Sequence, residues 1–193
     1  MSEFLVYLQI GIKHVLDWNG YDHILFLTVL SCTCTFKDWK KVLILVSIFT
    51  VGHTLSLLLS VFDVVVVKAY LIELLIPITI FLTAAKNVFS NRNTKKTDGF
   101  DLVSVFTLLF GIVHGLGFSN YFKNLLSGTF TDKLLPTLSF AAGIEVAQVV
   151  VVVAVLTVAF ACQNIFKVSK RDFVLVISSI VIGVVLPMII ERI

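Results

Sequence analysis

The sequence contains few charged residues. Asp, Glu, Lys and Arg make up 14% of its 193 residues, whereas soluble domains carry roughly 25%. Hydrophobic residues account for 58%, and the mean hydropathy is +1.03. This composition excludes an ordinary soluble domain and predicts an integral membrane protein.

Several familiar signals are also missing. The start of the chain carries Glu3 where a secretory signal has basic residues, and no small-residue cleavage site follows, so we expect the N-terminus to be retained. The three cysteines, Cys32, Cys34 and Cys162, lie in or beside apolar segments, which argues against a disulfide framework. Neither a nucleotide-binding motif nor H-E-x-x-H occurs. The net charge of +3 comes from basic residues clustered in loops, which indicates membrane topology and excludes nucleic-acid binding.

Long apolar windows alternate with charged loops. A transmembrane helix needs about 20 apolar residues, and six windows are of this kind: residues 20–35, 42–62, 65–89, 102–121, 134–166 and 173–190. Residues 4–16 precede them, and their roughly 20 Å of helix suits an interfacial or re-entrant segment. We therefore predict an all-α, polytopic membrane helix bundle with about six transmembrane helices and an additional N-terminal helix. It would form a single integral membrane domain over residues 1–193.

The loop charges predict the orientation. Ten of the fifteen basic residues follow the first, third and fifth windows: Lys37, Lys40, Lys41, Lys86, Arg92, Lys95, Lys96, Lys167, Lys170 and Arg171. The positive-inside rule places these loops in the cytoplasm and both termini outside. By analogy with duplicated transporters, the polar loop 91–100 would join three-helix halves, residues 1–90 and 101–193. The pattern F-x-x-x-H-x-L, which occurs around both His53 and His114, fits such a duplication.

Ionisable residues inside the spans are few. A charge at the bilayer centre costs about 2.5–3.5 kcal/mol on insertion scales, so such residues usually face the bundle interior. Because successive helices alternate in direction, these ionisable residues would lie at one depth, in the outer half of the membrane. The predicted metal site comprises His14, Asp22, His23, His53, Glu73, His114 and Glu145.

Neighbouring residues support this site. Gly111 and Gly115 flank His114 with small residues, which permit close helix approach and leave room for a ligand. Pro77 has no N–H, so the carbonyl of Glu73, four residues earlier, is left free at a kink.

Structural roles are the alternative. A single membrane histidine often packs or hydrogen-bonds between helices, and Glu73 and Glu145 can pair with histidines for the same purpose. Asp17 and Asp22 can cap helices on either side of the break at Asn19. Four histidines at one depth favour the metal site over these roles.

The residue types predict the class of ion. Imidazole together with carboxylate suits nickel, zinc, cobalt, iron or copper, whereas calcium and magnesium prefer oxygen ligands alone. In one arrangement, His23 is a ligand and Asp22 orients it or caps the helix. Cys32 and Cys34 lie near the inner end of the first span, where they are either inert thiols or a site for a thiophilic ion.

Five stretches, in order, resemble the HupE/UreJ family of bacterial membrane proteins, particularly its HupE/UreJ-like second branch: GYDHILFL, FTVGHTLSLLL, LIELLIPITI, FGIVHGLGFSN and FAAGIEVAQ. The resemblance extends from about residue 11 to residue 192. It implies a multi-pass protein of the bacterial inner membrane and, for the better-known members, nickel uptake serving hydrogenase or urease. The metal-path positions that it implies are His14, Asp22, His23, His53 and Glu145. Nickel permeases show H-P-x-x-G-x-D-H, whereas this chain lacks the proline and has two more residues before the glycine.

We therefore expect a permease for a divalent transition-metal ion, nickel in the first place and zinc or cobalt otherwise, rather than an enzyme. Its partners would be the ion, the lipid bilayer and, as an open question, a metallochaperone. The alternatives are an intramembrane zinc enzyme with Glu73 or Glu145 as general base, a haem protein with His53 and His114 as axial ligands, and a membrane scaffold.

Overall fold

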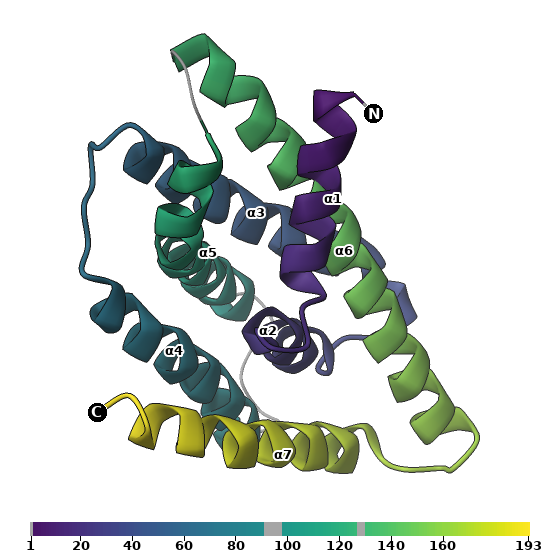
Figure 1. Cartoon of the computed structure of the whole chain (residues 1–193). Coiled ribbons are helices and arrows are strands. Elements are labelled where there is room, and N and C mark those ends of the chain that lie inside the picture. The colour runs from purple at the N-terminus through teal and green to yellow at the C-terminus, as the bar shows by residue number, and fades with distance from the viewer. Residues whose placement is uncertain (1, 91–97, 127–129) are drawn as a thin grey trace.

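A computed structural model of the chain describes residues 2–90, 98–126 and 130–193, and these residues are helical apart from short connections (Figure 1). Its helices are α1 (Glu3–Val15), α2 (Asp22–Ser31), the short 3-10 helix η1 (Phe36–Asp38), α3 (Trp39–Val61), α4 (Ala69–Phe89), α5 (Asp98–Leu125), α6 (Phe130–Asn164) and α7 (Lys170–Ile190). By length and composition, five of them, α3 to α7, can cross a membrane. The prediction of an all-α membrane bundle is confirmed.

The first predicted span, residues 20–35, forms only the 10-residue helix α2. Such a helix is about 15 Å long, half the thickness of the hydrocarbon core. A turn follows α2 and leads to a capping box at the start of η1, in which the backbone N–H and the hydroxyl of Thr35 both donate to Asp38 Oδ2, at 2.9 and 2.8 Å. The predicted N-terminal helix is α1, of 13 residues, so two short helices with a break between them precede the five long ones.

Three helix pairs build the bundle around α2. The closest pairings are α3 with α5, α1 with α6, and α4 with α7, and α2 lies between them near the centre (Figure 1). Each pair joins one helix from residues 1–90 to one that follows the predicted loop 91–100. Residues 91–97 of that loop lie outside the described residues, and α5 begins at Asp98. The closest helix packing in the bundle is therefore between helices that precede and helices that follow this loop.

Glycines set the closest helix approaches. A Cβ at Gly111 or Gly115 of α5 would meet the backbone carbonyl of Phe49 or His53 of α3. At the crossing of α1 and α6, a Cβ at Gly143 would meet the carbonyl of Leu8. Small residues at such positions allow membrane helices to pack backbone to backbone. The crossing of α3 and α5 brings His53 and His114 to the same region of the bundle interior.

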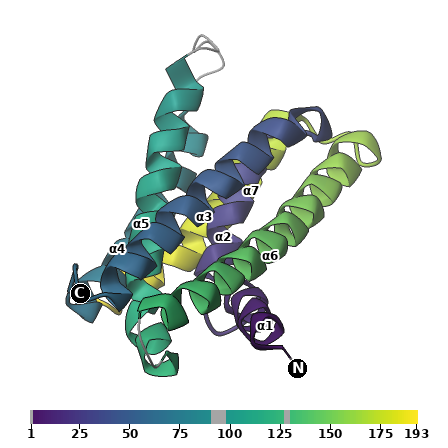
Figure 2. The same ribbon diagram turned by 90° about the horizontal axis from the view of Figure 1, so that it is seen from above.

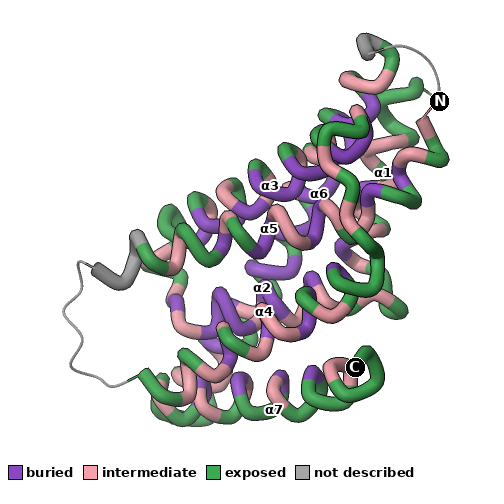
Figure 3. Tube along the Cα trace, turned by 90° about the vertical axis from the view of Figure 1, so that its left-hand side faces the viewer, coloured by how far each residue is buried: buried purple, intermediate pink, exposed green. Residues whose placement is uncertain are grey.

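The distribution of buried and exposed residues is that expected of a membrane helix bundle. Buried residues gather on the inward sides of the helices, and exposed residues lie outside (Figure 3). Many exposed side chains are large and apolar, among them Val51 at 60% and Leu109 at 50% exposure, as expected for surfaces that face lipid. Both termini lie at the same end of the bundle, opposite the turn between α6 and α7 (Figure 2).

Candidate metal-binding site

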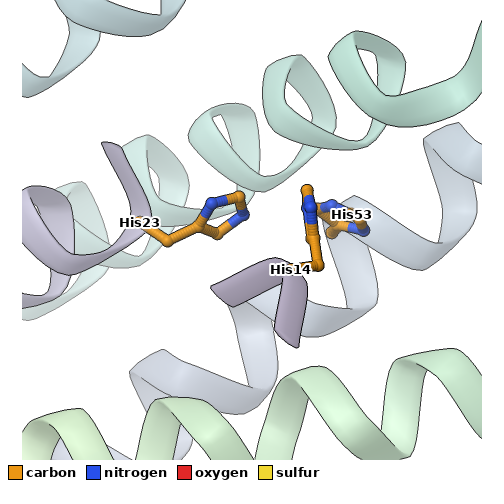
Figure 4. Close-up of side chains that lie close together, drawn as sticks. All are labelled: His14, His23 and His53. Atoms are coloured by element: carbon orange, nitrogen blue, oxygen red, sulfur yellow. The ribbon is translucent and has the colours of Figure 1, made fainter. Parts of the chain in front are cut away.

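Histidines from three helices meet beside the centre of the bundle (Figure 4). His14 lies in the last turn of α1, His23 at the start of α2, and His53 in the middle of α3. The ring centroids of His14 and His23 are 4.6 Å apart, and that of His53 lies 5.7 Å from His14 and 6.0 Å from His23. One potential ligand atom from each lies within 4.8 Å of the others, which forms the first triad.

A second triad shares His23 with the first. It consists of Asp22, His23 and His114, whose potential ligand atoms also lie within 4.8 Å of one another. His23 Nδ1 is 3.0 Å from Asp22 Oδ1, and His114 Nε2 is 3.7 Å from Asp22 Oδ2. Ligand atoms about 2.1 Å from a common ion are at most about 4.2 Å apart, so small rotations would let either triad close around a metal. We call these five residues the histidine cluster.

The break between α1 and α2 places three of the five. The backbone N–H of Asn19 donates to Asp17 Oδ1 at 2.9 Å, which is a local turn typical of Asp and Asn. The chain changes direction at this turn, and α2 begins at Asp22. Asp22 therefore lies in the first turn of α2, where the partial positive charge of the helix N-terminus stabilises a carboxylate. His14 and His23 thus face each other across the break.

The cluster contains ring nitrogens that have no hydrogen-bond partner among the described residues. These buried atoms are Nε2 of His14, His23 and His114 and both ring nitrogens of His53. His53 is 0% exposed, His114 2% and His23 3%. Buried polar groups nearly always have partners, and a set of unpaired ones in one place needs an explanation such as a bound ion.

In His23 and His114, the hydrogen bond made by Nδ1 determines which ring nitrogen carries the lone pair. His114 Nδ1 donates to the carbonyl oxygen of Phe110 at 3.2 Å, and His23 Nδ1 donates to Asp22. In a neutral imidazole, a protonated Nδ1 leaves Nε2 with a lone pair. Both Nε2 atoms are therefore prepared as metal ligands, in the way that carboxylates and carbonyls commonly orient metal-binding histidines.

Aromatic rings enclose the cluster, and the sequence analysis missed them. The ring of His14 lies 3.9 Å from that of Phe118, which stacks on Phe140 at 5.0 Å. Phe49 packs 5.8 Å from His23. An apolar wall lowers the local dielectric and controls access of water to a metal site. Phe118 follows His114 by four residues, so the two lie on the same face of α5, and this spacing could have predicted the contact from the sequence.

A pocket of about 900 Å³ opens beside the cluster at the α1–α2 break. Its lining includes His14, Asp17, Trp18, Asn19, Phe118 and Tyr121. Trp18 is 86% exposed, so the rim of the pocket reaches the surface of the molecule. His14 is the one residue of the histidine cluster that lines this pocket, so the pocket connects the surface of the molecule to the cluster.

Glu145 lies outside the two triads. Its Oε1 accepts a hydrogen bond of 2.7 Å from Ser47, and one turn away Thr50 donates to Gln148 Oε1 at 2.9 Å. Ser47, Thr50 and His53 are three residues apart on α3, so a row of polar groups between α3 and α6 leads from the cluster to Glu145. The sequence analysis missed Ser47, although its spacing from Thr50 and His53 is visible in the sequence.

Glu73 is also separate from the cluster. It is exposed, and its carbonyl oxygen, which Pro77 leaves without a helical partner, accepts a hydrogen bond of 2.5 Å from Arg192. Cys32 and Cys34 are buried and belong to neither triad. The structure thus brings together five of the seven predicted site residues.

The sequence matches the family model described as HupE / UreJ protein over residues 1–192. This match includes every residue of the histidine cluster, and the resemblance seen in the five motifs is confirmed. No curated protein matches the chain, and no solved structure matches it either.

Proposed function

The chain belongs to the HupE/UreJ family, and we propose that it is a permease that carries a divalent transition-metal ion, nickel or cobalt, through the histidine cluster. The family is associated with transport of these metals or with an accessory role in their use. We propose nickel as the principal ion and the bacterial inner membrane as the location, with both termini outside. The ion is the substrate in this account and does not remain in the protein.

The observation that carries the proposal is the set of unpaired nitrogens. Five buried ring nitrogens from four histidines lack a hydrogen-bond partner in the described structure. Burying such atoms is costly in a membrane protein unless they bind something. A divalent ion would satisfy several of them at once, whereas helix packing leaves them unsatisfied.

The donor set fits a transported transition metal. Imidazole nitrogens and one carboxylate suit nickel and cobalt, and the cluster contains no thiolate. With a single carboxylate, the cluster cannot fully neutralise a divalent ion. An ion held in this way is free to leave, and a permeation path must bind an ion well enough to admit it and weakly enough to release it.

The surroundings of the cluster support a path in two directions. On one side, the pocket at the α1–α2 break leads from the surface to His14. On the other side, the row from Thr50 and Gln148 to Ser47 and Glu145 continues along α3 toward the end that carries the basic residues. Glu145 would receive the ion after the cluster, which agrees with its expected place on the metal path.

No observation favours the enzyme alternative over transport. It required Glu73 or Glu145 as a general base, but Glu73 lies exposed beside Arg192, and Glu145 accepts a hydrogen bond from Ser47. Neither carboxylate belongs to a triad.

The test is uptake of radiolabelled nickel into liposomes that contain the purified full-length protein. His53→Ala removes a fully buried ligand, and we expect the initial rate of uptake to fall at least tenfold. Ser178→Ala is the matched control, because Ser178 is also a fully buried polar residue but lies in α7, outside the cluster. Equal uptake by His53→Ala and the control would rule out the proposal.

A further inference from the structure

The two triads overlap in one residue, His23, and have no other residue in common. His14 and His53 complete the first triad, and Asp22 and His114 complete the second. The ring of His23 lies 4.6 Å from that of His14 in the first triad and 4.6 Å from that of His114 in the second. The geometry raises the question of whether the cluster holds two ions or one ion in two positions.

The hydrogen bond between His23 and Asp22 answers this question. His23 Nδ1 donates to Asp22, and Nε2 is buried without a hydrogen-bond partner. A neutral imidazole has a lone pair on only one of its two nitrogens. A single lone pair binds one ion at a time. Two divalent ions this close would also repel each other strongly in the apolar surroundings of Phe49 and Phe118. Occupation of one triad therefore excludes occupation of the other.

The pocket assigns the order of the two positions. His14, a member of the first triad, lines the pocket at the α1–α2 break, whereas neither Asp22 nor His114 does. The two triads also differ in charge. The first consists of three imidazoles, and the second contains the carboxylate of Asp22. Within the cluster, an ion that arrives from the pocket meets the neutral ligands of the first triad before the carboxylate of Asp22.

We propose that a single divalent ion occupies two mutually exclusive positions in turn, first at His14, His23 and His53 and then at Asp22, His23 and His114, with His23 handing it from one to the other. This inference rests on the proposed function for its direction. The transfer exchanges the imidazoles of His14 and His53 for the imidazole of His114 and the carboxylate of Asp22, and His23 belongs to the ligand set before and after it.

The test uses Co²⁺ as the probe, because its visible absorption reports the ligands around it. Purified full-length protein in detergent is titrated with cobalt chloride, and bound metal is counted after equilibrium dialysis. We expect one Co²⁺ per wild-type chain. His114→Ala retains the first position and His53→Ala the second, so each variant binds Co²⁺ but with a different spectrum, since only the second position contains a carboxylate.

The shared residue gives the decisive comparison. We expect His23→Ala to weaken Co²⁺ binding at least tenfold more than either other variant, because it removes a ligand from both positions. Gel filtration and thermal unfolding establish that each variant is folded, and His23→Gln replaces His23→Ala if the latter aggregates. In stopped-flow mixing, His114→Ala should load Co²⁺ faster than His53→Ala, because its remaining position adjoins the pocket.

Three results would overturn the inference: two Co²⁺ ions in the wild-type chain, identical spectra for His53→Ala and His114→Ala, or equal loading rates for these two variants. Failure of the proposed function has a different signature. Wild-type liposomes would then take up no Co²⁺, whereas the binding pattern in detergent, which does not depend on transport, would still support two alternative positions.

Discussion

The Nδ1 atom of His23 lies 3.0 Å from Oδ1 of Asp22, the residue directly before it in the chain. The same carboxylate also accepts the backbone N–H of His23 at 2.8 Å, so Asp22 fixes both the backbone and the ring of its neighbour. This arrangement holds His23 Nε2 toward the rest of the cluster. A carboxylate that orients a metal-binding histidine in this way also makes it a stronger ligand.

Asp22→Asn tests the contribution of this carboxylate, which both orients His23 and belongs to the second triad. Loss of an orienting carboxylate typically lowers metal affinity about 10–100-fold, and we expect a reduction of this size in nickel binding measured by isothermal titration calorimetry. Asp63→Asn is the control, because Asp63 lies in the α3–α4 connection and pairs with Lys123 at 2.8 Å. The hydrogen bond and charge of Lys123 lower the pKa of Asp63, so this control also replaces a charged carboxylate. Equal affinity in both variants would argue against the assigned role.

Gly115→Ala tests the crossing of α3 and α5. The new Cβ would meet the carbonyl of His53 and the hydroxyl of Ser56, so the helices must move apart. Overpacking of this kind costs about 1–3 kcal/mol. We expect a lower thermal unfolding midpoint and weaker nickel binding, because the separation moves His53 away from His114.

Gly183→Ala is the matched control for that substitution. Gly183 lies in α7, and a Cβ there would meet no atom within 4 Å. We expect an unfolding midpoint at or slightly above that of the wild type, since alanine favours the helix more than glycine does. If the two glycine variants unfold at the same temperature, the close crossing of α3 and α5 is not what stabilises this region.

Gly143→Ala perturbs a different part of the cluster. Its Cβ would meet the carbonyl of Leu8, which would push α1 away from α6. Because α1 carries His14 and none of the other cluster residues, we expect the Co²⁺ spectrum to shift toward that of His53→Ala. A spectrum unchanged from the wild type would mean that the position of His14 does not depend on this crossing.

The sequence predicted where the long helices begin and end better than it predicted which face of each helix points into the bundle. Apolar windows located α3 to α7 to within a few residues, and the alternating direction of the spans predicted the meeting of His53 and His114. The window at residues 20–35 was less informative, because α2 ends at Ser31 and the rest of the window forms a turn and the start of the capping box of η1. Window hydropathy does not register such a local hydrogen-bonding pattern.

The positions of the two glutamates show a second limit. Helices α4 and α6 are apolar all round, so hydrophobic periodicity does not indicate which face points inward. Ile72 is buried and the adjacent Glu73 is exposed, a difference that depends on how α4 packs against its neighbours. The sequence predicted Glu73 and Glu145 at the depth of the cluster, but Glu145 bonds to Ser47, six residues before His53 on α3, and Glu73 lies beside Arg192 after the end of α7.

Arg171→Ala tests the anchoring of α4 at the end of the bundle away from the termini. Arg171 donates to the carbonyl oxygens of Asn87 at 2.9 Å and Val88 at 2.6 Å, which are unpaired groups at the end of that helix. Hydrogen bonds from charged groups contribute about 1.5–3 kcal/mol. We expect a lower unfolding midpoint with unchanged nickel affinity, because the cluster residues lie on other helices. Exposed Lys37 provides the control Lys37→Ala, which should leave both quantities unchanged. A loss of nickel affinity in Arg171→Ala would contradict this separation of stability from binding.

The central claim is that imidazoles of the histidine cluster hold the transported ion, and X-ray absorption at the nickel edge tests it most directly. The account predicts that nickel-loaded wild-type protein shows the outer-shell scattering of at least two imidazole rings, that it shows no sulfur ligand, and that His23→Ala loses this signal. A nickel–sulfur shell would instead place the ion at Cys32 or Cys34 and contradict the account. Imidazole scattering unchanged in His23→Ala would contradict it equally.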